Sequence, residues 1–91
     1  MTGRRWRQGE EVAARRVDDR VVLVNLQTNH IFSLNATGSR VWELLDVARS
    51  RDELVAALQK EFEVDPQELE RETDTLLASL EEASLVSSDG D

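Results

Sequence analysis

The sequence predicts an α+β domain in which three antiparallel strands are followed by three helices, in the order βββααα. Two observations support this prediction. Segments 11–17 and 20–26 are rich in Val and Leu and are joined by two aspartates, a connection that suits a tight hairpin. The second half of the chain then has apolar residues at helical spacing, in three segments that each follow a capping residue.

The third strand is predicted at His30–Leu34. A polar break at 27–29 separates it from the preceding segment, and the run itself is β-branched and aromatic. In a simple meander this strand lies at the edge of the sheet. It contains neither Pro nor Lys, residues that commonly protect an edge from pairing with another chain.

The three predicted helices are recognised by their caps and by apolar residues three and four positions apart. Ser50 and Glu53 have the spacing of a capping box, and Pro66 occupies the first helical position after its cap. The predicted caps are Asn35, Ser50 and Asp65, and the helices that follow them end near Asp46, Glu63 and Glu82. We expect these helices to cover one face of the sheet.

Length and periodicity define the expected domain boundaries. A chain of 91 residues can form one modest core, and no internal repeat divides it. Residues 1–10 lack a regular period and are expected to be a flexible N-terminal segment, and residues 87–91 a disordered tail. The domain itself is predicted to span residues 11–86.

The charge of the chain excludes several classes of partner. Its net charge is -8, and residues 21–91 hold five basic against fifteen acidic residues. Such a surface repels phosphate groups and anionic lipid, so neither nucleic acid nor a membrane is an expected partner. No apolar segment follows the Arg-rich start, so no secretory signal is expected and the cytoplasm is the expected location.

The residue types that catalysis requires are scarce. There is no cysteine, and His30, the one histidine, is more typical of an exposed strand residue than of a base or a metal ligand. The adjacent acidic pairs point in divergent directions and do not converge on one ion. We therefore predict that the protein is not an enzyme and has no catalytic residue, metal or cofactor.

Two kinds of binding remain open. The predicted order of elements resembles a winged helix-turn-helix, a shape associated with DNA regulators. However, the helical segment 65–82 holds seven acidic residues against Arg71 alone, which opposes contact with phosphates. An open strand at 30–34 beside a leucine-rich helix instead predicts a groove for an extended peptide.

The order of several short motifs is similar to that of a known family. Leu34-Asn35 is followed by Ala-Thr-Gly-Ser-Arg-Val-Trp-Glu-Leu-Leu-Asp, and Asp74-Thr-Leu-Leu-Ala-Ser-Leu precedes Leu85-Val86. This arrangement, over 12–86, resembles PqqD-like proteins, the recognition elements for precursors of ribosomally synthesised, modified peptides (RiPPs). The resemblance implies that a precursor leader adds as a strand to the third strand, beside the third helix. The implied peptide-binding residues are His30, Ile31, Phe32, Ser33, Leu34, Leu69, Thr73, Leu76, Leu77 and Leu80.

The resemblance also bears on the pathway. Members that serve quinone cofactor synthesis usually carry a Pro-Glu-Gly turn before the Leu-Asn pair, whereas this chain has Gln27-Thr28-Asn29-His30. Residues 22–45 look more like the stand-alone recognition proteins of lasso peptide clusters. The implied partners are the precursor leader peptide, a transglutaminase-like leader peptidase and an asparagine synthetase-like cyclase. The alternative is a PqqD-type chaperone for a radical SAM enzyme that modifies peptides.

Overall fold

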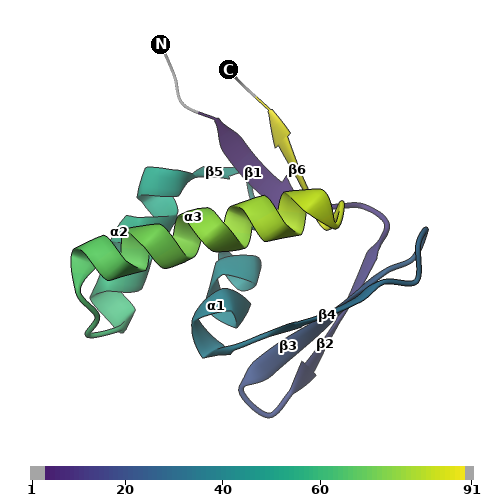
Figure 1. Ribbon diagram of the computed structural model, residues 1–91, viewed down its shortest axis with the longest axis horizontal. Helices are drawn as coiled ribbons and strands as arrows, with labels where there is room; N and C mark the ends of the chain where they lie inside the picture. The colour runs from purple at the N-terminus through teal and green to yellow at the C-terminus, as the bar shows by residue number, and fades with distance from the viewer. Residues whose placement is uncertain (1–3, 90–91) are drawn as a thin grey trace.

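The computed structural model describes residues 4–89, which form a flat molecule of 35 × 33 × 19 Å. Figure 1 shows α3 crossing the molecule, with a small sheet on one side, built from residues near the two ends of the chain and from residues 49–50, and a larger antiparallel sheet on the other. The elements, in chain order, are β1 (Arg5–Gln8), β2 (Val12–Val17), β3 (Arg20–Asn25), β4 (Ile31–Leu34), α1 (Ala36–Leu44), β5 (Arg49–Ser50), α2 (Arg51–Glu61), α3 (Pro66–Glu82) and β6 (Val86–Asp89).

The predicted three-stranded meander is confirmed. Its strands lie in the order β2-β3-β4, and Val17 pairs with Arg20 across the two-residue turn. Asp18 in this turn has a φ of 59°, a left-handed conformation that Asp adopts more readily than most residues. Because β3 is central, β2 and β4 are the two edges of the meander.

The core lies between the meander and the helices. Alternate residues of β3 point inward, and Val21 and Leu23 are at most 4% exposed. They pack in one cluster with Val41 and Trp42 of α1 and with Leu80 of α3. The opposite, outer face of the meander carries no helix in the described part of the chain, and Ile31 on it is 66% exposed.

The helix starts agree with the predicted caps. Asn35 accepts a hydrogen bond from the N–H of Gly38 at 2.8 Å, and Ser50 and Glu53 form both bonds of a capping box. Asp65 accepts from the N–H of Gln67, and Pro66 is the first residue of α3. The first two helices end at Leu44 and Glu61, two residues before the predicted ends.

The expectation for the two ends of the chain was wrong where the structure describes them. Residues 5–8 form β1, which pairs with β5 on one side and with β6 on the other. Trp6 is 9% exposed, so its burial anchors this strand against the body. Residues 1–3 and 90–91 of the expected flexible ends lie outside the described residues.

One buried amide joins the meander to the end of α3, a role that the sequence did not reveal. The side chain of Asn25, which is 1% exposed, donates to the carbonyl of Ala83 at 2.8 Å. Its Oδ1 accepts from the N–H groups of Gln27 and Thr28. Because its donor and acceptor are both used, Asn25 can be buried without an unsatisfied polar atom.

Candidate functional site

The open side of β4 carries main-chain groups that face no other strand. The N–H of Asn25 donates to the carbonyl of His30 at 2.9 Å, beside the register that pairs β3 with β4. Bonded and non-bonded pairs alternate in an antiparallel ladder, so Phe32 directs its main-chain groups toward β3, whereas Ile31 and Ser33 direct theirs outward. Within the described part of the chain nothing pairs with this side. The edge can therefore accept an added strand.

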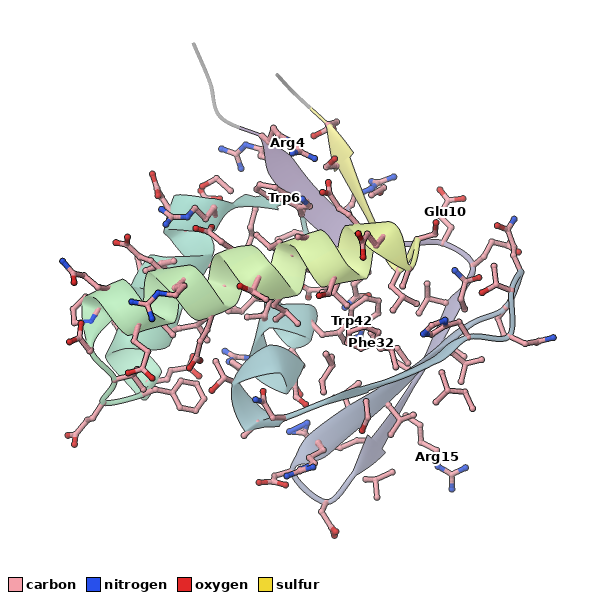
Figure 2. The ribbon with its side chains drawn as sticks, in the orientation of Figure 1. Arg4, Trp6, Glu10, Arg15, Phe32 and Trp42 are labelled. Atoms are coloured by element: carbon pink, nitrogen blue, oxygen red, sulfur yellow. The ribbon has the colours of Figure 1, made fainter. Side chains whose placement is uncertain are left out.

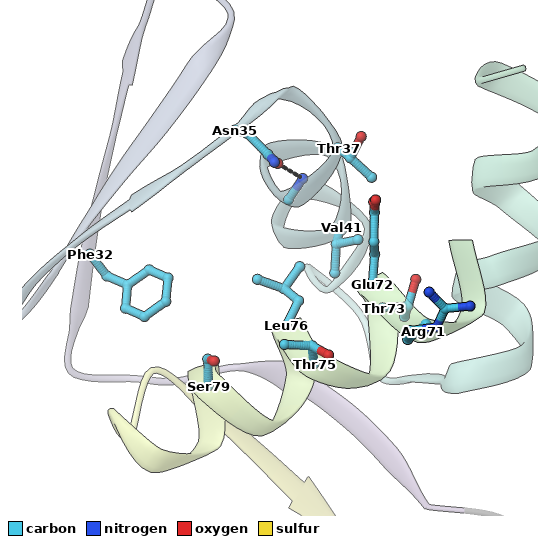
Figure 3. Close-up of a pocket in the computed structure, with 11 residues that line it drawn as sticks. Phe32, Asn35, Thr37, Val41, Arg71, Glu72, Thr73, Thr75, Leu76 and Ser79 are labelled. Atoms are coloured by element: carbon cyan, nitrogen blue, oxygen red, sulfur yellow. Dashed lines mark hydrogen bonds between the residues drawn. The ribbon is translucent and has the colours of Figure 1, made fainter. Parts of the chain in front are cut away.

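A cavity of about 340 Å³ lies beside this edge, between β4, α1 and α3. Figure 3 shows Phe32 from the strand, Val41 from α1 and Leu76 from α3 around it. The other side chains and glycine that line the cavity are Asn35, Thr37, Gly38, Arg71, Glu72, Thr73, Thr75 and Ser79. The cavity thus has both apolar and polar lining residues, which suits a side chain of a peptide that is bound to the edge of β4. We call this edge and cavity the β4 groove.

Helix α3 presents two different faces to the rest of the molecule, because residues three and four positions apart share a face. One face packs into the core, and its members Leu69, Leu77 and Leu80 are at most 3% exposed. The adjacent face has the same spacing and lines the cavity through Glu72, Thr75, Leu76 and Ser79. The groove-lining face is thus mostly polar.

The predicted peptide-binding residues fall into separate places. Phe32, Thr73 and Leu76 line the cavity. Ile31 and Ser33 belong to the open edge, but their side chains lie on the outer face of the sheet because strand residues alternate. Their contribution to the β4 groove is therefore made by the main chain.

Four of the predicted residues are core residues instead. Leu34, Leu69, Leu77 and Leu80 are at most 3% exposed, so neighbouring elements already cover their side chains. His30 is exposed and precedes β4, with its ring 6.4 Å from that of Phe32. The cavity residues that sequence reasoning did not select are Asn35, Thr37, Gly38, Val41, Arg71, Glu72, Thr75 and Ser79. The helical spacing of 72, 75, 76 and 79 could have identified four of the cavity positions, had polar residues been counted.

Thr73 differs from the other buried polar side chains. It is 1% exposed, and its Oγ1 has no hydrogen-bond partner among residues 4–89. A buried hydroxyl without a partner costs about 1–3 kcal/mol. Since Thr73 also lines the cavity, a polar group of a bound peptide would offset this cost.

Two of the acidic residues of α3 form ion pairs with a residue of α2. Arg51 at the start of α2 donates to Asp74 at 2.6 Å and to Glu70 at 3.3 Å. The hydrogen bond to Asp74 raises the pKa of Arg51, against the opposing effect of burial, so the guanidinium stays charged. These ion pairs join α2 to α3 on the side away from the residues that line the cavity.

Residues 4–89 contain no cluster of three or more His, Asp or Glu side chains that could hold a metal ion. None of the described helices combines the length and the apolar character that a membrane span requires.

A family model described as coenzyme PQQ synthesis protein D (PqqD) matches residues 20–86. The chain belongs to the PqqD family. The predicted family is thereby confirmed, as is the α+β class with a three-stranded antiparallel sheet and three helices. The winged helix-turn-helix is only a loose comparison for this PqqD-family fold.

Two solved structures share the fold of this PqqD-family chain. One is described as TbiB1 in complex with the TbiA(beta) leader peptide; it is 35% identical, with a TM-score of 0.82, over 93% of this chain and 99% of that one. The other is described as lasso peptide synthetase B1 complexed with the leader peptide; it is 24% identical, with a TM-score of 0.77, over 90% of this chain and 96% of that one. At that identity the second shows the fold alone. No curated protein matches the chain.

Proposed function

We propose that this protein is a non-catalytic adaptor that binds the leader of a ribosomally made precursor peptide and presents it to maturation enzymes. The observation that carries the proposal is the open edge of β4 directly beside a cavity on α3. The similarity to TbiB1, whose structure contains a leader peptide, supports it over nearly the full length of both chains. Phe32 and Leu76 face each other across that cavity (Figure 3).

In this proposal, the main chain and the side chains of the β4 groove have different tasks. The leader forms a fourth strand of the meander through the N–H and C=O groups of Ile31 and Ser33. Alternate leader side chains then point toward α3, where Phe32 and Leu76 provide apolar contact. A polar leader group near Thr73 satisfies the unpaired hydroxyl. Main-chain bonds set the register, and the cavity selects the side chain.

The adaptor acts by raising the local concentration of the precursor beside its processing enzyme, without reacting itself. The partners proposed for that step are a transglutaminase-like leader peptidase and an asparagine synthetase-like cyclase. We propose accordingly that the protein acts in lasso peptide biosynthesis; the fold that it shares with a lasso peptide synthetase B1 is consistent with this role.

Fluorescence anisotropy of the labelled leader peptide of a candidate precursor tests the proposal. We expect a Kd of about 1 µM or lower that changes little with salt, because main-chain bonds and apolar contacts dominate. A labelled DNA duplex should not bind, since the chain carries a net charge of -8.

Leu76→Asp should weaken leader binding by about tenfold or more, because it places a charge in the cavity. Ala78→Asp is the matched control, since Ala78 is an exposed residue of the same helix that does not line the cavity. Circular dichroism must show that both variants are folded. Normal leader binding by folded Leu76→Asp would mean that the leader binds elsewhere.

A further inference from the structure

The meander has a second open edge, on the opposite side from β4. The N–H of Leu26 donates to the carbonyl of Glu11 at 2.9 Å, at the end of the register that pairs β2 with β3. By alternation, Ala14 and Arg16 direct their N–H and C=O groups away from β3. No strand pairs with them in residues 4–89.

A cavity of about 400 Å³ lies along this edge, on the inner side of the sheet. Ala14 of β2, Val21 of β3 and Trp42 of α1 provide its apolar lining. The ion pair between Arg16 and Glu43 borders it and satisfies both charges. An additional strand on β2 would therefore find apolar surface on its inner side.

The outer side of the same edge is basic, in a chain whose net charge is -8. Arg15 is exposed and also borders this cavity, and none of the ion pairs among the described residues includes its side chain. Figure 2 shows it extending away from the body of the molecule. The nearest acidic residues in sequence, Glu11 and Asp18, lie beyond the two ends of β2. The centre of the edge thus attracts negative charge.

We propose that the β2 edge binds an extended segment of a partner protein in which acidic and apolar residues alternate. Its main chain pairs with Ala14 and Arg16, an acidic side chain contacts Arg15 on the outer face, and the neighbouring apolar side chains enter the cavity beside Trp42. Charge complementarity identifies the occupant, because the exposed guanidinium has no internal partner.

A second copy of this chain is a poorer occupant. Pairing two β2 strands would bring the exposed Arg15 of each copy into one junction between two molecules that each carry a charge of -8. The β2 edge and the β4 edge lie on opposite sides of β3, so both can be occupied at the same time. The proposal does not depend on what binds at β4.

The test is NMR titration of the ¹⁵N-labelled protein with a seven-residue peptide of alternating Val and Glu. We expect shifts of the amide signals of Ala14 and Arg16. Arg15→Glu should weaken binding by about tenfold or more, whereas Lys60→Glu, the same charge change on an exposed residue of α2, should not. A Val and Lys peptide should bind Arg15→Glu better than the unaltered protein.

Two proline variants distinguish the edges. Ala14→Pro removes an N–H that faces outward and should abolish binding, because proline is tolerated on an edge strand but cannot donate. Ser33→Pro makes the same change on β4 and should leave binding intact. If Ala14→Pro does not fold, the charge exchange at Arg15 still tests whether the peptide binds at the β2 edge. Three results would overturn the proposal. The peptide does not bind at about 1 mM, Arg15→Glu leaves its binding unchanged, or Ser33→Pro abolishes its binding.

Discussion

Thr73 lines the cavity with a buried hydroxyl that should destabilise the free protein. Its Oγ1 is buried without a hydrogen-bond partner among residues 4–89, and the residue lines the cavity. Thr73→Val keeps the shape and removes the hydroxyl, so we expect the free energy of unfolding to rise by about 1 kcal/mol. Chemical denaturation measures this. Leader affinity should fall in the same variant; a loss of stability would show that the hydroxyl has a partner after all.

Glu81 makes the stability of the protein depend on pH. Burial alone would raise the pKa of its carboxyl, but hydrogen bonds from Ser88 and Trp6 and the charge of Arg4 outweigh burial and lower the pKa below 4.5. The folded state therefore binds this proton less readily than the unfolded state. The stabilisation is complete above the unfolded-state pKa and is lost as the pH falls through the folded-state pKa.

Glu81→Gln should consequently lower the free energy of unfolding by about 1 kcal/mol at pH 7, where the carboxylate is charged. The difference from the unaltered protein should shrink in acid below pH 4.5. Thermal or chemical denaturation from pH 7 down to that range measures it. A difference that stays constant over the whole range would exclude a role for the charge of Glu81.

Single residues also explain which parts of the groove could be predicted. Phe32 and Leu76 are among the apolar residues that the family resemblance implies for peptide binding, and both line the cavity. Leu69 and Leu80 are implied in the same way, yet they are fully buried. Apolar periodicity finds the face of a helix that is removed from water, and in a helix that packs on a core this is the core face. A groove that stays accessible keeps polar residues such as Thr75.

At the scale of elements, α3 ends in a turn whose left-handed residue is a serine, where glycine would be the less strained choice. The N–H of Leu85 donates to the carbonyl of Leu80, and that of Ser84 to Glu81, which is the pattern of a Schellman motif. Ser84 has a φ of 58°, a conformation that costs a residue with a Cβ about 1 kcal/mol. Ser84→Gly should therefore raise the free energy of unfolding by about that amount.

The control for Ser84→Gly is Ser87→Gly, a change of the same type in the exposed strand β6, where glycine should destabilise slightly. Denaturation curves of both variants give the comparison. Equal effects of the two changes would show that the left-handed conformation of Ser84 stores no strain.

Local signals predicted most of the elements. The two-residue hairpin, the capping box at Ser50 and the Asp65-Pro66 start are contained in a few adjacent residues, and each was confirmed. Strand β1 has no such signal, because Trp6 is its one apolar residue and its partner β6 lies at the other end of the chain. Strand β1 therefore forms only because folding brings it next to β6, and no local pattern in the sequence predicts it.

For the molecule as a whole, α3 connects the sites and the sheets. Its cavity face borders the β4 groove, and its last turn holds Trp6, whose Nε1 donates to Glu81 at 3.0 Å. The guanidinium of Arg4 lies 4.9 Å from the centre of the Trp6 ring (Figure 2). The small sheet at the two ends of the chain thus fixes the helix that lines the groove.

Trp6→Ala should accordingly lower the free energy of unfolding by about 3–5 kcal/mol, the cost of removing a buried aromatic side chain. Trp6→Phe retains most of the buried area and loses the hydrogen bond to Glu81, so its cost should be nearer 1 kcal/mol. Chemical denaturation of both variants, followed by circular dichroism, measures the difference. A cost below about 1 kcal/mol for Trp6→Ala would mean that β1 is only loosely attached, as the sequence alone suggested. A large cost instead makes the ends of the chain part of the folded unit that supports the β4 groove.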